Sequence, residues 1–97
     1  MLTYIVLGSF TDQGIRSVKD TTKRADAAKE AAKRFGVTMR DIYWTQGQYD
    51  IVSVCEANDE AAISAFGLAL ASAGNVRFQT LRAFNRDEMT AVLAKLA

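Results

Sequence analysis

The stretch that decides the fold is RDIYWTQGQYDIVSVCEA, residues 40–57 of a chain of 97 residues. Two runs rich in β-branched and aromatic residues flank a short polar segment, QGQYD. Such runs, separated by turn residues, are typical of a β-hairpin. We therefore predict two antiparallel strands over residues 37–46 and 50–57.

The turn of this hairpin sets its register. Gly47 and Gln48 fit a two-residue loop with glycine first, the type II′ pattern. This loop pairs Gln46 with Tyr49, and further along it pairs Trp44 with Ile51 and Ile42 with Ser53. The residues between them, Tyr43, Val52 and Val54, are then sent to the opposite face of the sheet.

The rest of the chain supplies two further strands and three helices. Residues 2–10 alternate as a strand does, whereas apolar residues from Ile15 to Phe35 recur three or four apart, as on a helix that Gly36 ends. Residues 59–73 form an apolar helix with Asp59 or Asn58 as its cap. Residues 75–84 form a fourth strand, and the chain ends in a helix capped by Asn85.

The order of these elements is β-α-β-β-α-β with an added C-terminal helix. This is the ferredoxin-like plan of an α+β domain. Right-handed crossovers place the strands at 2–10 and 50–57 side by side in the centre of the sheet. We expect residues 1–97 to form this single domain, because the chain is too short for a second one.

Helices cover only one face of such a sheet, yet both faces are predicted to be apolar. Strand 2–10 turns Tyr4 and Val6 to one side and Ile5 and Leu7 to the other. An exposed apolar patch of this size is unusual on a soluble monomer. The pattern therefore predicts that two sheets pair face to face in a dimeric α/β barrel, so that the first partner of the chain is itself, as a homodimer or a higher homo-oligomer.

Composition excludes several classes of function. A net charge of +1 argues against a nucleic-acid partner. The apolar runs are too short to span a membrane, and the N-terminal residues lack a signal-peptide pattern. The chain has no histidine and one cysteine, Cys55. We therefore expect no Ser-His-Asp triad, no metal site, no cofactor, no disulfide and a cytoplasmic location.

Three segments carry a family resemblance. TYIVLGSFTDQGIRSVKD, YWTQGQYDIVSV and GNVRFQTLRAF resemble the GYD domain family in order and spacing, with Gly47, Tyr49 and Asp50 as the glycine-tyrosine-aspartate group. The resemblance implies a ferredoxin-like domain of the dimeric α/β-barrel type and no particular activity. A more distant likeness is to the effector-binding domain of Lrp/AsnC-type regulators. It implies that an amino-acid-like ligand binds near Gly47, Tyr49, Asp50 and Thr80.

Asp50 has two interpretations. A carboxylate at the start of an apolar central strand needs backbone N–H groups, an arginine or a ligand as its partner. Arg82, which we expect at the same end of the sheet, is the favoured partner, and Arg82 completes the predicted ligand-binding set. Alternatively, Gly47 and Asp50 only shape the turn, and Tyr49 packs beside Trp44.

The loop TDQGIR, residues 11–16, is expected at the opposite end of the sheet from the hairpin. Thr11, Asp12, Gln13 and Arg16 either line the mouth of a pocket between helix and sheet or form a capped loop. The helix start there is suited to holding an anion.

Two functions are compatible with these residues. The first is a small oligomeric module without chemistry of its own, which binds an amino-acid-like ligand or a protein partner at a subunit interface. The alternative is a cofactor-independent oxygenase, isomerase or dehydratase of the dimeric α/β-barrel type, with Tyr49, Asp50 or Asp12 as acid or base. We favour the binding module, because histidine is absent.

Overall fold

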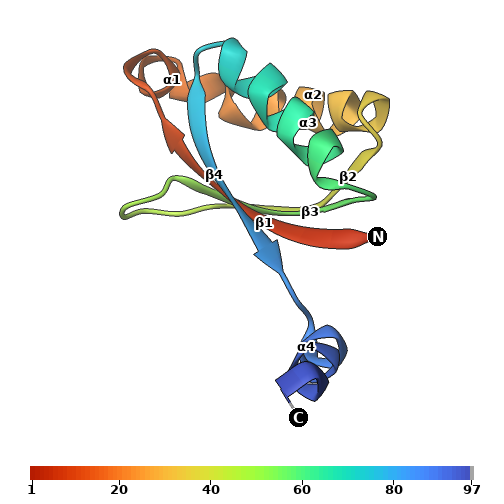
Figure 1. Ribbon diagram of the computed structural model, residues 1–97. Coiled ribbons are helices and arrows are strands. Elements are labelled where there is room, and N and C mark those ends of the chain that lie inside the picture. The colour runs from red at the N-terminus through yellow and green to blue at the C-terminus, as the bar shows by residue number, and fades with distance from the viewer. Residues whose placement is uncertain (97) are drawn as a thin grey trace.

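The computed structural model describes residues 1–96 (Figure 1). It contains four strands, four α-helices and two short 3-10 helices. In chain order they are β1 (Leu2–Phe10), α1 (Asp12–Arg16), η1 (Val18–Asp20), α2 (Thr21–Arg34), β2 (Val37–Trp44), β3 (Ile51–Ala57), α3 (Glu60–Ser72), β4 (Val76–Ala83), α4 (Arg86–Leu93) and η2 (Ala94–Leu96).

The four strands form one antiparallel sheet in the order β2-β3-β1-β4. Strand β1 has the bounds predicted for it and lies beside β3 in the centre. The prediction of an α+β chain with these central strands is confirmed, and the arrangement is compatible with a ferredoxin-like fold. In Figure 1 the helices α1, α2 and α3 lie over one side of the sheet.

The hairpin has the predicted register but a wider loop. Trp44 pairs with Ile51 and the ladder continues through Ser53 as expected. However, β2 ends at Trp44, and the loop is closed by the Thr45 N–H, which donates to the Asp50 carbonyl at 2.8 Å. The two-residue loop and the pairing of its flanking residues were therefore wrong. The Thr45 hydroxyl donates to the Tyr49 carbonyl at 2.6 Å. In a two-residue turn this carbonyl would instead accept from a backbone N–H of the opposite strand.

Strand β2 contains an irregularity between Met39 and Asp41. A β-bulge adds one unpaired residue and changes which face the following side chains occupy. Met39 and Ile42, three positions apart, therefore both pack on the helix side of the sheet.

The long helix predicted from Ile15 is divided into α1, η1 and α2. The Arg24 guanidinium donates to the carbonyl oxygens of Ser17 at 2.8 Å and Gly14 at 3.4 Å. These carbonyls thus have partners without a continuous helix, and Ile15 and Val18 stay exposed. The C-terminal end of α2 agrees with the prediction, because Gly36 follows it with a φ of 73°.

The core lies between the sheet and helices α2 and α3. The rings of Phe35 and Phe66, at the end of α2 and within α3, lie 5.9 Å apart between their centroids. Along each strand, every second side chain points to the helix side of the sheet. The buried apolar residues are Tyr4, Val6, Ala32, Val37, Met39, Cys55, Ala57, Ile63 and Phe66.

Helix α4 stands away from this body. Strand β4 continues past the sheet and carries α4 to the side opposite the other helices (Figure 1). The Cα radius of gyration is 14.5 Å, whereas a compact domain of this length has about 12.5 Å. The asparagine cap was predicted correctly: the Asn85 side chain accepts from the Glu88 N–H at 2.8 Å, and Glu88 accepts from the Asn85 N–H at 2.9 Å.

Two glycines provide a test of how closely the layers approach. A Cβ on Gly14 would lie 2.0 Å from the Asn75 carbonyl oxygen, whereas a Cβ on Gly67 in α3 would have no neighbour within 4 Å. We expect Gly14→Ala to lower the free energy of unfolding by about 1–3 kcal/mol. Gly67→Ala should raise it by up to about 1 kcal/mol through helix propensity. Urea unfolding measures both, and equal effects would contradict the close packing of α1 on the loop before β4.

Candidate functional site

Asp50 links the ends of β1, β2 and β3 at one end of the sheet. Its carboxylate Oδ2 accepts a hydrogen bond from the Phe10 N–H at 2.8 Å, at the end of β1. Its own N–H donates to the Gly8 carbonyl at 2.8 Å, and its carbonyl accepts from Thr45. Of the partners predicted for this carboxylate, the backbone N–H is the one observed. The side chain thus extends the pairing of β1 beyond the last residue of the ladder.

The other two residues of the motif lie next to Asp50. The Tyr49 hydroxyl donates to Gln79 Oε1 on β4 at 2.5 Å, which holds the loop over the end of the sheet. Gly47 is at the exposed tip with a φ of 143°, in the region that favours glycine. Glycine, tyrosine and aspartate therefore each have a structural contact or conformation. Their predicted role in ligand binding stays a prediction.

Arg82 is at the opposite end of the sheet, so its predicted pairing with Asp50 was wrong. Arg82 pairs with Tyr4 near the start of β1, while Asp50 contacts Phe10 at its end. Six residues of strand separate these positions, which is about 20 Å. The reason is that β3 and β4 are both antiparallel to β1, so their first residues share one end and their last residues the other.

Arg82 connects the sheet with α4. Its guanidinium donates to the carbonyl oxygens of Thr3, at 3.2 Å, and Ala83, and lies 3.9 Å from the Glu88 carboxylate. It also stacks over the Phe84 ring, with its Cζ 4.5 Å from the ring centroid. These contacts orient the first turn of α4 relative to the end of the sheet.

The loop at residues 11–16 is at the Asp50 end of the sheet, not opposite it as predicted. The Thr11 hydroxyl accepts from the Gly14 N–H at 3.1 Å and donates to the Gly74 carbonyl at 2.5 Å. Gln13 donates to the Ala73 carbonyl at 3.0 Å. These contacts are those of a capped loop that binds the chain before β4, which is the second of the two predicted interpretations.

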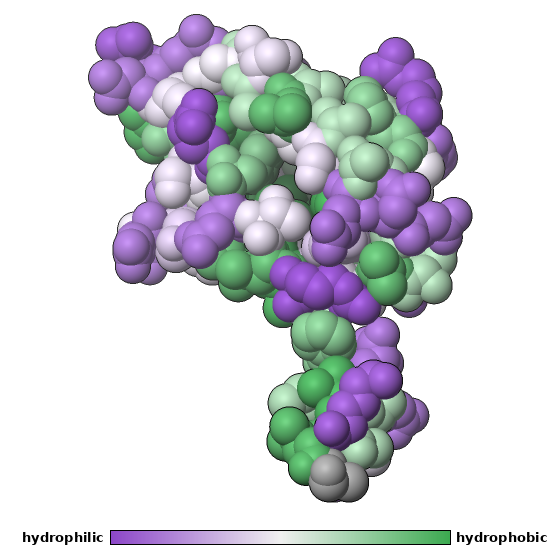
Figure 2. Space-filling view, in the orientation of Figure 1, coloured by the Kyte–Doolittle hydropathy of each residue, from purple (hydrophilic) through white to green (hydrophobic). Residues whose placement is uncertain are grey.

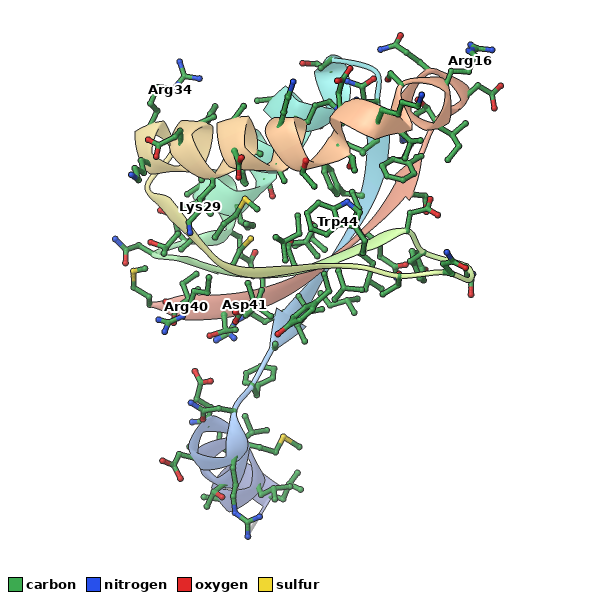
Figure 3. The ribbon with its side chains drawn as sticks, turned by 180° about the vertical axis from the view of Figure 1, so that it is seen from behind. Arg16, Lys29, Arg34, Arg40, Asp41 and Trp44 are labelled. Carbon is green, nitrogen blue, oxygen red and sulfur yellow. The ribbon has the colours of Figure 1, made fainter. Side chains whose placement is uncertain are left out.

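One face of the sheet is uncovered and has an apolar centre. Adjacent positions on β2, β3, β1 and β4 bring together Tyr43, Val52, Val54, Ile5, Leu7 and Leu81. We call these six residues the open face. Polar residues border it on β2 and β3: Arg40 forms an ion pair with Glu56 at 2.9 Å, and Figure 3 shows Arg40 and Asp41 on the side away from the helices. An apolar centre with a polar rim is the usual composition of a protein interface.

Helix α4 adds a second uncovered apolar surface. Four residues spaced as i, i+3, i+4 and i+7 lie on one side of α4 and η2, and none is buried: Met89, Val92, Leu93 and Leu96. Figure 2 shows apolar residues at the surface of this C-terminal segment. A helix of this length is marginal in water unless it packs against something.

A cavity of about 300 Å³ lies on the other side of the sheet, under α2 and α3. Thr80, the last of the predicted site residues, lines it, as do Ser53 and Cys55. Burial raises the pKa of the Cys55 thiol, and its contact with Ser53 opposes that shift to a smaller extent. The thiol is therefore protonated at neutral pH, and Cys55 serves as a small buried apolar residue.

The predicted site residues therefore fall into three places. Gly47, Tyr49 and Asp50 are at one end of the sheet, Arg82 is at the other, and Thr80 faces the cavity. Within residues 1–96 there is no group of three or more cysteines and carboxylates that could hold a metal ion. In the same range, no helix has the length and apolar character needed to cross a membrane.

The fold and these surfaces define a class: small α+β domains whose antiparallel sheet has helices on one face and an uncovered apolar face opposite. Within this class the chain belongs to the GYD domain family, which it matches over residues 4–93. The resemblance inferred from the three sequence segments is thus confirmed.

Two comparisons add detail. The chain is 37% identical over 94 residues to the "Glutamine synthetase and cystathionine beta-lyase binding protein" of Thermus thermophilus, covering 96% of this chain and 99% of the relative. The crystal structure of TTHA0845, also from Thermus thermophilus, aligns with a TM-score of 0.56 and 24% identity, over 88% of this chain and 95% of the other. That likeness supports the fold alone.

The role of Asp50 can be tested by removing its acceptor. We expect Asp50→Ala to lower the free energy of unfolding by about 1–3 kcal/mol, because the Phe10 N–H loses its partner. Asp50→Asn retains an acceptor oxygen and should cost less than about 1 kcal/mol. Asp26→Ala, at an exposed aspartate of α2, is the control and should stay within about 0.5 kcal/mol. Hydrogen exchange at the Phe10 amide should accelerate in the alanine variant, and unchanged exchange would contradict this role.

Proposed function

We propose that this chain is a non-catalytic protein-binding module that works as a homodimer and binds a metabolic enzyme. The observation that carries the homodimer is the open face, an apolar surface that the chain's own helices leave uncovered, while the enzyme partner rests on the similarity to a named binding protein. A binding function needs such a surface and does not need a titratable group enclosed with a substrate. Asp50, the strongest acid–base candidate of the sequence, is instead engaged with the backbone of β1.

The occupant that we assign to the open face is a second copy of the chain. Leu81 is 40% and Tyr43 60% exposed, and they lie at the two edges of the open face with half-buried aliphatic residues between them. Two such sheets packed face to face, about 10 Å apart, would bury the aliphatic centre of each. The predicted dimeric α/β barrel has this arrangement.

Helix α4 supports the same occupant. Helix α4 lies on the same side of the sheet as the open face (Figure 1). A second sheet packed on the open face would therefore lie beside α4. Its apolar side, exemplified by Leu93 at 51% exposure, could then pack on the second copy. One partner would thus cover both apolar surfaces, and Arg82 would set the angle at which α4 reaches it.

The enzyme partner is proposed from the relative. A protein 37% identical over nearly the whole chain is named for binding glutamine synthetase and cystathionine beta-lyase. We propose that this chain binds one or both of the corresponding enzymes, in the cytoplasm, through the outer surface of the dimer. The exposed hairpin tip around Gly47 is a prominent part of that surface.

The predicted amino-acid-like ligand is retained in a narrower form. Tyr49 reaches the open-face side of the sheet through its bond to Gln79, so it would lie at the rim of the dimer. A ligand bound at the subunit interface, as the Lrp/AsnC likeness implies, would meet Tyr49 and Gly47. Arg82 would be too distant to contribute from the same chain.

The homodimer is tested by a charge placed in the open face. Leu81→Arg should give a monomer of 10.6 kDa by light scattering, where the unchanged chain gives twice this mass, because burying an unpaired charge is strongly unfavourable. Leu68→Arg, at a 72% exposed leucine on the outer side of α3, is the matched control and should remain dimeric. Hydrogen exchange should show α4 protected in the dimer only. A monomeric unchanged chain at micromolar concentration would overturn the assembly.

The enzyme partner is tested separately with purified glutamine synthetase and cystathionine beta-lyase from the same source. We expect the unchanged chain to bind at least one of them with a Kd near or below about 10 μM in biolayer interferometry. Binding to neither enzyme at tenfold higher concentration would overturn the partner and leave the homodimer standing.

A further inference from the structure

We infer that the cavity between the helices and the sheet is a binding site for a neutral, mostly apolar small molecule of one or two rings with a hydrogen-bonding group. The cavity has a volume of about 300 Å³ and lies on the side of the sheet away from the open face. Its walls are apolar side chains of α2, α3 and the sheet, among them Ala28, Ile42, Ile63 and Phe78. The inference is independent of the proposed dimer and of its enzyme partner.

The space exists because the sequence places small residues where a solid core would need large ones. Helix α2 turns Ala25, Ala28 and Ala31 to the cavity, three residues apart on one side of the helix. From α3 the wall includes Gly67, where an added Cβ would meet nothing within 4 Å. A leucine at any one of these positions would reduce the volume, because its side chain is three carbons longer than that of alanine.

The space is partly open to the surface, so its apolar walls meet water unless a ligand covers them. Covering apolar surface is favourable by about 25 cal/mol per Å². Dry apolar cavities of about 150 Å³ bind benzene. The present cavity has about twice that volume and is at the lower end of the range for ligand pockets. A two-ring molecule is therefore the size that fits.

The floor of the cavity supplies hydroxyl groups. Ser53 on β3 and Thr80 on β4 both pair with Val6 on β1, so they lie on either side of it in one row across the sheet. Ser53 is only 7% exposed, and its hydroxyl has one partner, the Cys55 sulfur at 3.8 Å. Sulfur is a weak hydrogen-bonding partner. The Ser53 hydroxyl is therefore available to bond a ligand from the floor.

The one charged residue that lines the cavity is already hydrogen-bonded to a neighbouring segment of the chain. Arg24 is the one charged residue among those lining the cavity. Its guanidinium is directed to the end of α1, where it donates to Ser17 and to the Gly14 carbonyl. Burying a charge without a partner is strongly unfavourable. A neutral ligand is therefore favoured over an acid or an amine.

Trp44 supports the wall next to the cavity. Its indole N–H donates to the Thr21 hydroxyl at 3.0 Å, which ties β2 to the start of α2. In Figure 3 the Trp44 side chain lies between the sheet and α2. In Figure 2 the surface is hollowed between the helix layer and the sheet. The Trp44–Thr21 hydrogen bond thus stabilises one wall of the cavity, and the cavity is open to the surface.

The test uses indole and naphthalene as probes with the full-length chain. Titration followed by methyl NMR should shift the methyl groups of the cavity wall, Ala25, Ala28, Ile42 and Ile63, and leave Ile5 and Leu81 of the open face unchanged. The indole-3-acetate ion should bind at least about tenfold more weakly than indole, because its charge finds no partner. No shift at saturating indole, or shifts confined to the open face, would overturn the inference.

Two variants separate the cavity from the general fold. Ala28→Leu should narrow the space and weaken the binding of both probes by about tenfold through overlap with the bound rings, whereas Ala69→Leu, at an exposed position of α3 outside the cavity, should not. Ser53→Ala keeps the space, so naphthalene should bind unchanged while indole weakens by about three- to tenfold. If Ala28→Leu does not fold, the Ser53 variant decides: equal loss of both probes, or of neither, would contradict the hydroxyl contact.

Discussion

The pairing of β1 on both sides is the constraint on which the other features depend. Because β3 and β4 are both antiparallel to β1, their first residues meet where β1 ends. The chain closes this end with three contacts: Asp50 to the Phe10 N–H, Asp50 N–H to Gly8, and the Thr11 N–H to the Asn75 carbonyl. The glycine-tyrosine-aspartate motif therefore has a structural role, which is to fix the end of the central strand β1. A role in binding would be additional to this structural role.

Local signals in the sequence predicted most of the fold. Strand alternation identified β1, the hairpin register placed Trp44 opposite Ile51, and the caps at Asp59 and Asn85 marked the starts of two helices. These features depend on residues close together in the chain. The division of the first helix was missed because its apolar spacing continues through Ser17, while the break depends on Arg24 reaching back to carbonyl oxygens. Periodicity does not report a contact of that kind.

The candidate site was predicted less well, for a related reason. The sequence correctly showed that the Asp50 carboxylate needs a partner, but choosing Arg82 required knowing which ends of β3 and β4 coincide. A pocket between helix and sheet was considered only at the loop of residues 11–16, and the residues that line the observed cavity were not identified. Alanines on α2 are good helix formers, so their presence in a helix signals nothing more than the helix itself. The cavity becomes visible only when these alanines are seen to face Gly67 of α3 and the cross-strand row from Ile42 to Thr80 in the sheet. Ser53 gave no signal, because a serine within an apolar strand has no distinctive pattern.

The two faces of the sheet can serve different ligands because strand alternation separates them residue by residue. Val6 contributes to the cavity floor, while its neighbours Ile5 and Leu7 belong to the open face. A ligand in the cavity would change assembly only if it bound the monomer and the dimer with different affinity. Strand β1 has hydrogen-bonded neighbours on both sides, so it has little freedom to transmit a small shift between faces. Helix α4 is joined to the sheet mainly through Arg82 and could move without disturbing the ladder. In the proposed assembly, regulation is therefore more easily placed at the α4 junction than across the sheet, and the proposed cavity site is independent of the proposed interface.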